Sequence, residues 1–192
     1  MENVSYKIEI VRSKRRTMAL EITATGRVVV RAPWEIPQWR IDEFTKDKAA
    51  WIEHHLKKKK EDGEVLREQG IFTEDDIQKM IRLAKKIIPE KVAYYSRVMG
   101  VPYGRISIRK QKSRWGSCSR EGNLSFNCLL VMAPPEVLDY VVVHELSHRL
   151  EMNHSQRFWR EVGRILPDYN KARMWLKENG NELMLRMHGC KE

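Results

Sequence analysis

The stretch HELSH, residues 144–148, places two histidines four positions apart, with a glutamate directly after the first. On a helix, side chains four residues apart lie on the same face, about 5–6 Å from each other. His144 and His148 can therefore point one ring nitrogen each at a shared metal ion. Glu145 lies about 100° further around the helix, where its carboxylate can reach a water on the metal without being a ligand. This spacing predicts a metal-dependent hydrolytic centre.

A third histidine can complete the ligand set. Catalytic zinc sites hold three protein ligands and keep the fourth position for water, and His154 follows His148 by six residues. On an unbroken helix His154 would point away from the other two rings, so the helix must end soon after Arg149 and the chain must fold back. Asn153 favours such a turn because it tolerates left-handed backbone angles. We therefore expect one Zn²⁺ per chain, held by His144, His148 and His154.

Glu145 is the expected general base of this centre. It would take a proton from a water whose pKa zinc lowers towards ~7, and later pass it to the leaving amine. A histidine or tyrosine commonly helps to hold the developing oxyanion. Tyr140 and Tyr169 are both possible, and Asp168 is a candidate partner for a ligand histidine. The sequence does not choose among these three.

The helix that carries the motif has a clear start. Pro134-Pro135 followed by Glu136 suits a helix N-terminus, because proline costs little in the first turn and an acid is favourable there. Apolar residues at helical spacing over 158–166 predict a second helix. A last helix over about residues 171–178 is expected to close at Asn179-Gly180.

The N-terminal part of the chain has a strand pattern. Apolar and polar residues alternate over residues 4–32 and predict a three-stranded antiparallel meander, which needs a helix to cover its apolar face. Helical spacing follows, and Gly63 and Gly70 bracket a polar link. We expect an N-terminal β-meander and helix over 1–63 and the metal-binding domain over 71–192, as two domains or as one compact unit.

The middle of the chain predicts one helix and two strands. Thr73 and Asp76 form a capping box at the start of a helix, and Pro89 should kink or break it. Apolar residues alternate at 106–108 and again at 124–126, which predicts a strand on each side of the RWGSCSREGN connection.

Composition bounds the class of protein. A hydrophobic fraction of 42% in 192 residues is enough for a core, and no apolar run reaches the ~18 residues that cross a bilayer. The chain starts without the apolar stretch of a signal peptide. Three cysteines, Cys118, Cys128 and Cys190, have no metal-ligand spacing and argue against a disulfide framework. We expect a cytoplasmic protein that does not engage membranes; the oligomeric state stays open.

Several stretches of this sequence resemble the YgjP-like zinc metallopeptidase family, which is related to the SprT-like proteases within the zincins. The resemblance covers nearly the whole chain and is most specific over residues 113–176. It implies zinc ligands His144, His148 and His154, a catalytic Glu145, and a peptide or protein substrate. The metzincin spacing also fits, but Glu151 stands where metzincins have glycine. The matching stretches are SKRRTMALEI, RVVVRAP, RWGSCS, NLSFN, APPEVLDYVVVHELSH, MNHSQRFW and PDYNKARMWL.

The resemblance also implies an architecture. We expect an α+β fold with a zincin-like core, in which the HExxH helix lies beneath a small mixed or antiparallel sheet, plus the N-terminal three-stranded β-meander and helices. Gly122–Asn127 is then either the edge strand along the cleft, where an extended peptide could pair, or an ordinary paired strand. Cys118 is expected to be a small buried residue, and Trp115 is expected to lie beside the site, with core packing as its main role. The expected substrate-binding residues are Arg114, Trp115, Asn123, Ser125 and Asn127.

The charge of +10 leaves two other functions open. Arg105–Arg120 contains six basic residues and no acid, and cations next to a metal centre favour polyphosphates. The alternative is therefore a metal-dependent hydrolase of nucleotide phosphoanhydrides. A basic surface can also contact nucleic acid nonspecifically, as in a DNA-associated protease of the SprT-like kind. Lys57–Lys60 is interpreted as a solvated helix face.

Overall fold

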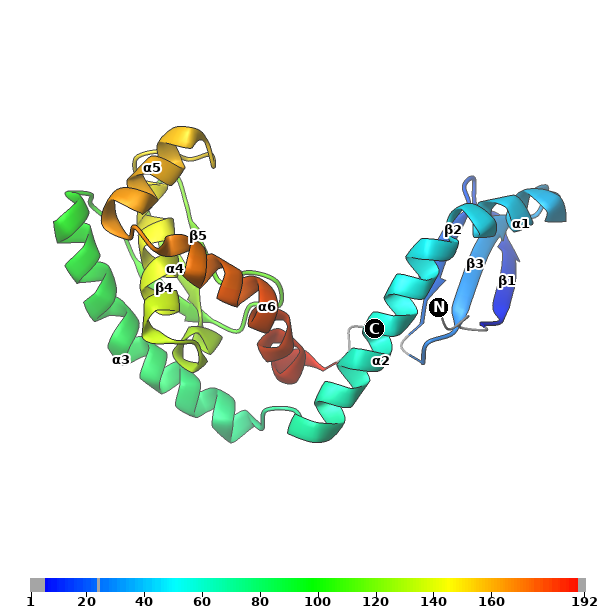
Figure 1. The fold of residues 1–192 in the computed structure, drawn as a ribbon, viewed down its shortest axis with the longest axis horizontal. Helices are drawn as coiled ribbons and strands as arrows, with labels where there is room; N and C mark the ends of the chain where they lie inside the picture. Colours follow the sequence, from blue (N-terminus) through cyan, green and yellow to red (C-terminus); the bar gives the residue numbers. More distant parts are fainter. Residues whose placement is uncertain (1–5, 24, 190–192) are drawn as a thin grey trace. The chain divides into compact units, whose positions relative to one another are not determined.

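The structure of the chain is a computed structural model that describes residues 6–23 and 25–189 (Figure 1). It divides into two compact units whose boundary lies between Gly70 and Ile71. The residues up to Gly70 form the N-terminal unit, and Ile71–His188 form the C-terminal unit. Among the described residues, no helix combines the length and the apolar character that crossing a lipid bilayer requires.

The N-terminal unit is built on a mixed sheet, so the predicted antiparallel meander is wrong. Its strands are β1 (Ile8–Ser13), β2 (Ala19–Ile22) and β3 (Val28–Pro33), in the order β1-β3-β2. β3 pairs with β1 in parallel and with β2 in antiparallel orientation. Val28, Val29 and Val30 are all buried, and such a continuous apolar run is typical of a central strand. Residues 4 and 5 of the predicted first strand lie outside the described residues.

Two helices follow in this unit, α1 (Gln38–Asp47) and α2 (Ala49–Gln69). Ile41 of α1 packs with Val30 and Ala32 of β3 in a small core. The predicted polar link after Gly63 is instead the C-terminal end of α2. One glycine in a helix costs only about 1 kcal/mol relative to alanine, and most residues of α2 near it, such as lysine, glutamate, leucine and arginine, are good helix formers. The helix ends at Gly70, which has a positive φ of 71°.

The C-terminal unit opens with α3 (Glu74–Met99), whose predicted capping box is confirmed. The Asp76 N–H donates to Thr73 Oγ1 at 3.2 Å, and the Thr73 N–H donates to the Asp76 carboxylate at 3.0 Å. Pro89 does not break the helix, although it removes one backbone hydrogen bond. Ile88 and Val92, on either side of it, are fully buried, and their packing holds the helix together through the proline.

A second mixed sheet follows, made of β4 (Ile106–Arg109), β5 (Gly116–Cys118) and β6 (Leu124–Asn127). The strand predictions at 106–108 and 124–126 are confirmed, whereas β5 was not predicted. The order is β4-β6-β5, so of the two alternatives for Gly122–Asn127 the edge strand is wrong and the ordinary paired strand is confirmed. β6 is central because Leu124 and Phe126 fill the core, and β5 is at an edge. A short 3-10 helix, η1 (Cys128–Met132), comes next.

Three helices complete this unit: α4 (Pro135–Ser147), α5 (Gln156–Ile165) and α6 (Tyr169–His188). α4 starts as predicted, with Pro135 in its first turn. It contacts α3, α5, α6 and β5, and it lies between α3 and α6 (Figure 1). Since α4 is buried on nearly every side, it is the central element of the unit. A helix carrying HExxH against a small mixed sheet confirms the predicted α+β class.

α6 is longer than predicted because Gly180 does not end it. Gly180 lies inside the helix and is buried. A Cβ at this position would come within 2.9 Å of Trp115 Cζ2. The glycine therefore makes room for the Trp115 indole, which packs against the core of the C-terminal unit. The core-packing role considered for Trp115 is confirmed by this contact.

Candidate active site

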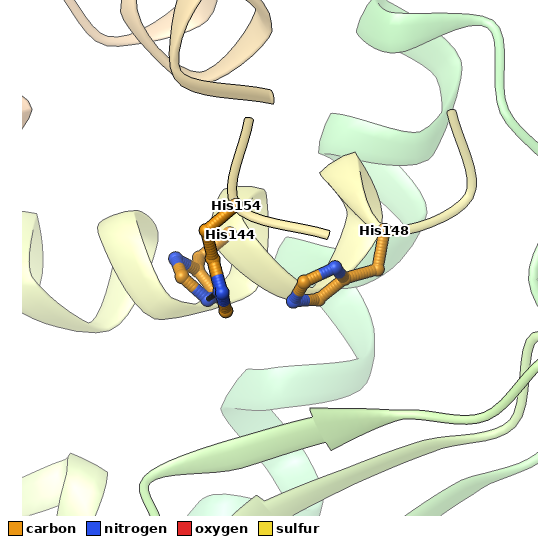
Figure 2. A group of neighbouring side chains, drawn as sticks. All are labelled: His144, His148 and His154. Carbon is orange, nitrogen blue, oxygen red and sulfur yellow. Dashed lines mark hydrogen bonds between the residues drawn. The ribbon is translucent and has the colours of Figure 1, made fainter. Parts of the chain in front are cut away.

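Three histidine side chains meet beside α4 (Figure 2). His144 is in the last turn of α4, His148 is the residue at its C-terminal end, and His154 belongs to the segment that follows. The Nε2 atoms of His144 and His154 are 3.0 Å apart, and one ring nitrogen from each of the three lies within 4.8 Å of the others. Nitrogen ligands on a tetrahedral zinc, with bonds of ~2.0–2.1 Å, are about 3.3 Å apart. The three nitrogens are close enough to share one metal ion, and three imidazoles are a donor set that zinc accepts.

The chain turns back immediately after α4. The N–H groups of residues 149–151 donate to carbonyls three or four residues earlier, which tightens and ends the helix. The turn does not use a left-handed Asn153, as the sequence suggested, since no described residue other than glycine has a positive φ. Ser155 then starts α5, and its hydroxyl accepts the Phe158 N–H at 3.4 Å. His154 is thus fixed by its place next to a capped helix.

Phe158 is the common support of the three imidazoles. Its ring centroid lies 4.8 Å from that of His144, 4.7 Å from His148 and 4.8 Å from His154. Phe158 is fully buried, so its ring packs against all three imidazoles and restricts their positions. The neighbouring Trp159 stacks on His154 at 5.8 Å. The sequence predicted that both aromatics lie on the apolar face of a helix. Their closeness to His154 in the chain was the one sign that they would also contact the histidine rings.

The second ring nitrogens of the histidines have different surroundings. His148 Nδ1 lies 3.2 Å from the Glu151 carbonyl, which leaves its Nε2 for a metal. His144 Nδ1 is buried without a hydrogen-bond partner among the described residues. Asp168, the partner considered from sequence, is exposed and forms an ion pair with Lys171 at 3.3 Å. The structure does not bring Asp168 to these rings.

The protein environment keeps two of the imidazoles neutral. Burial, together with the charges of His148, His154 and Arg173, lowers the pKa of His144 to about 3. Burial also lowers the pKa of His148, against the opposing effect of its hydrogen bond to the Glu151 carbonyl. Neutral imidazole is the form that binds metals. The site therefore needs no deprotonation of these two ligands at neutral pH.

Glu145 lies between α4 and the edge strand β5. Its side chain is buried, and burial raises its pKa to about 8, partly opposed by the positive charge of Arg114. A Cβ on Gly116 would lie 2.6 Å from Glu145 Oε1, so the carboxylate rests on the bare backbone of β5. The sequence did not single out Gly116. The only sign of a role for Gly116 at the site was its position in RWGSCS, one of the stretches that resemble the family.

The other residues expected to bind substrate fall into two groups. Asn123 and Ser125 line a groove on the polar face of the β4-β6-β5 sheet, together with Arg105 and Arg109, and none of the three histidines lines that groove. Asn127 is fully buried, and its amide nitrogen donates to the carbonyls of residues 111 and 114 at 2.8 and 3.0 Å. The Asn127 side chain therefore holds the loop before β5 and is not available to a substrate.

Two tyrosines and an arginine lie close to the histidines. The Tyr140 ring lies 5.8 Å from that of His144 and stacks on Tyr169 at 6.3 Å. Burial raises the Tyr140 pKa to about 12, so its hydroxyl stays protonated. The Arg173 guanidinium lies 4.9 Å from the centre of the Trp159 ring. Sequence analysis named both tyrosines but not Arg173, whose position depends on how α6 packs.

This geometry coincides with a family match over most of the chain. The model of the YgjP-like metallopeptidase domain matches residues 16–79 and 73–179. The chain belongs to the YgjP-like family. It is therefore a hydrolase of the metallopeptidase class, and the family implies a metal ion and a peptide or protein substrate. No curated protein matches the sequence.

Two crystal structures of archaeal metallopeptidase zymogens are similar to part of this YgjP-like chain. The zymogen of Pyrococcus abyssi abylysin has 22% identity and a TM-score of 0.43, over 47% of this chain and 94% of abylysin. The zymogen of Methanocaldococcus jannaschii jannalysin has 22% identity and a TM-score of 0.44, over 49% of this chain and 97% of jannalysin.

Proposed function

We propose that the protein is a zinc-dependent peptidase in which His144, His148 and His154 hold one Zn²⁺ and Glu145 is the general base. One observation carries this proposal. Three imidazole rings converge beside α4, and the carboxylate that follows the first of them is buried against an open strand edge. This combination suits attack of water on a carbonyl held between the strand and the metal.

Each group at the site has a separate role in the proposed reaction. Bound zinc would polarise the substrate carbonyl and lower the pKa of water towards ~7. Glu145 takes the proton of the attacking water, because its carboxylate directly follows the first ligand in the chain and lies against the edge strand β5. It then delivers this proton to the leaving nitrogen. Tyr140, Tyr169 and Arg173 are the candidate donors of a hydrogen bond to the oxyanion, because Tyr140 lies next to His144, Tyr169 stacks on Tyr140, and the charge of Arg173 acts on His144.

The edge of β5 gives the substrate backbone a place to bind. The Asn127 N–H donates to the Trp115 carbonyl, and the Ser119 N–H donates to the Asn123 carbonyl. Because antiparallel pairs alternate in hydrogen bonding, the N–H and C=O groups of Gly116 point away from β6, towards the open edge. An extended peptide pairing there would lie next to Glu145, and its recognition would tolerate many side chains.

The Glu145→Gln variant tests the assignment of the general base. Its kcat for a peptide should fall by about 10²–10⁴ or more, while its zinc content stays that of the wild type, since Glu145 is not a ligand. His54→Ala, which changes an exposed histidine of the N-terminal unit, is the matched control and should keep full activity. Wild-type turnover in the Glu145→Gln protein would assign the activity to a contaminant or to another base.

One observation favours an additional partner. The groove lined by Arg105, Arg109, Asn123 and Ser125 has no acidic residue in its lining, so phosphate groups of nucleic acid are a suitable ligand. Binding that weakens with added salt is expected, and a salt-independent binding constant would exclude this contact. The groove is separate from the histidines, which removes the main motive for phosphoanhydride hydrolysis. A cytoplasmic location accords with Cys118 and Cys128 being unpaired.

A further inference from the structure

A pocket of about 520 Å³ lies between α4, the turn from α5 to α6, and the first turns of α6. Its lining includes the buried residues Val137, Tyr140 and Ala172 and the partly buried Leu166 and Trp175. Its volume is in the range of pockets that bind small organic groups, and its lining is mostly apolar, as in such pockets. None of these residues was assigned a substrate contact by the sequence, apart from Tyr140 as a possible oxyanion donor.

The pocket shares a wall with the metal centre. Tyr140 precedes His144 by one helical turn, and their ring centroids are 5.8 Å apart. Tyr169, which also lines the pocket, stacks on Trp159 at 5.5 Å, and Trp159 in turn stacks on His154. A peptide whose scissile carbonyl lies at the histidines therefore has a neighbouring side chain within reach of the pocket mouth.

Charged groups in the lining lie only at the rim. Glu136 is exposed, and Asp168 and Lys171 form an ion pair of 3.3 Å with more than four fifths of each side chain accessible to solvent. The interior offers no carboxylate or ammonium group to pair with a charged ligand. Burying a charge there would cost several kcal/mol, whereas a large apolar side chain gains about 1.5–3 kcal/mol from burial. The chemistry of the lining thus selects an uncharged, bulky group.

We propose that this pocket receives a large apolar side chain of the peptide substrate, from a residue next to the scissile bond. The proposal rests on the peptidase function and adds its specificity: Leu, Ile, Met or Phe at one position beside the cleaved bond. Ala172 and Trp175 are then specificity-determining residues. They take no part in the chemical step.

Cleavage of a peptide mixture by the zinc-loaded full chain tests this directly. Mapped sites should be enriched in large apolar residues at one position. For a peptide pair that differs there by Leu against Ala, kcat/KM should favour Leu by roughly tenfold to a hundredfold. Equal cleavage of both peptides would overturn the assignment of the pocket.

Filling the pocket gives a sharper test with a matched control. Ala172→Phe should remove the preference, lowering kcat/KM for the Leu peptide at least about tenfold while the Ala peptide changes by less than about threefold. Met174→Phe adds the same side chain to an exposed position of α6 that does not line the pocket, and it should keep the wild-type preference. An Ala172→Phe protein that retains the preference would overturn the proposal. A fold defect would instead reduce both rates and would show in the far-UV circular dichroism.

A binding measurement separates this proposal from the peptidase function. N-acetyl-leucinamide added to the metal-free full chain should shift the NMR resonances of the Ala172 amide and the Trp175 indole, and N-acetyl-lysinamide should not. Such shifts without cleavage of any peptide would leave the pocket standing and contradict the peptidase proposal. Cleavage without these shifts and without an apolar preference would contradict the pocket alone.

Discussion

The two sheets of this protein share one topology but not one use. In each, the last strand lies in the middle, parallel to the first and antiparallel to the second. The β1-β3-β2 sheet carries exposed ion pairs such as Arg31–Glu21 at 2.9 Å. The β4-β6-β5 sheet has Gly116 at its edge, against a buried glutamate. Because the strand order is the same in both sheets, the difference in function must come from the residues that pack against the edge strand.

The largest expected effects are losses of stability from core substitutions in the two central strands, each confined to the unit that contains the strand. Phe126→Ala removes a fully buried ring from β6 and should cost about 3–5 kcal/mol of unfolding free energy. Val30→Ala removes a fully buried side chain from β3 and should cost about 2 kcal/mol. Hydrogen exchange resolved by segment should assign each loss to its own unit. Equal losses in both units from either variant would show a single cooperative core.

A glycine substitution tests the contact that distinguishes the two edges. Gly116→Ala places a methyl group where Glu145 now lies, so we expect kcat to fall about 10²-fold or more while zinc content is retained. Gly63→Ala in α2 has no atom within 4 Å of the new methyl and is the control. It should leave activity unchanged and raise stability by about 0.5–1 kcal/mol. Unchanged kcat in Gly116→Ala would place the catalytic base elsewhere.

The pH dependence of the metal-free C-terminal unit offers a smaller effect with a defined sign. Burial raises the pKa of Glu145 from 4.5 to about 8, so the folded state holds a proton there that the unfolded state has released. This contribution to stability is full below pH 4.5 and is lost as pH rises to about 8. Urea unfolding at pH 5 and pH 8 should therefore show Glu145→Gln gaining stability over wild type as pH rises. An identical pH dependence of the two proteins would contradict a raised pKa.

His144 acts in the opposite direction in the same metal-free unit. Its pKa is lowered from 6.5 to about 3, so the unfolded state binds a proton that the folded state does not. Stability is therefore lost as pH falls from about 6.5 towards 3. Because this range overlaps that of Glu145 between pH 4.5 and 6.5, the comparison between pH 5 and pH 8 sets wild type against Glu145→Gln, in which His144 is unchanged and its effect cancels.

Features set by neighbouring residues could be predicted from the sequence. The Thr73–Asp76 capping box, the start of α4 and the pairing of His144 with His148 each depend on residues no more than four positions apart. The return of His154 follows from the same geometry once a third ligand is required. For these features the local chain and the fold agree, so the pattern was sufficient.

Features set by contacts between distant segments could not be predicted. β5 has no apolar alternation, and it is a strand only because β6 pairs with it. Gly180 has the sequence pattern of a helix end, yet Trp115, 65 positions earlier, occupies the space beside it. The central place of β3 and β6 depends on strand pairing, which periodicity does not contain. The apolar pocket likewise exists only because α6 packs against α4.

Metal content measured by mass spectrometry on the purified full chain tests the central claim most directly. The wild type should contain one zinc per chain, His148→Ala should contain less than about a tenth of that, and the His54→Ala control should match the wild type. Zinc content in His148→Ala equal to that of the wild type, or an equal loss in His54→Ala, would contradict a site built from the three converging histidines.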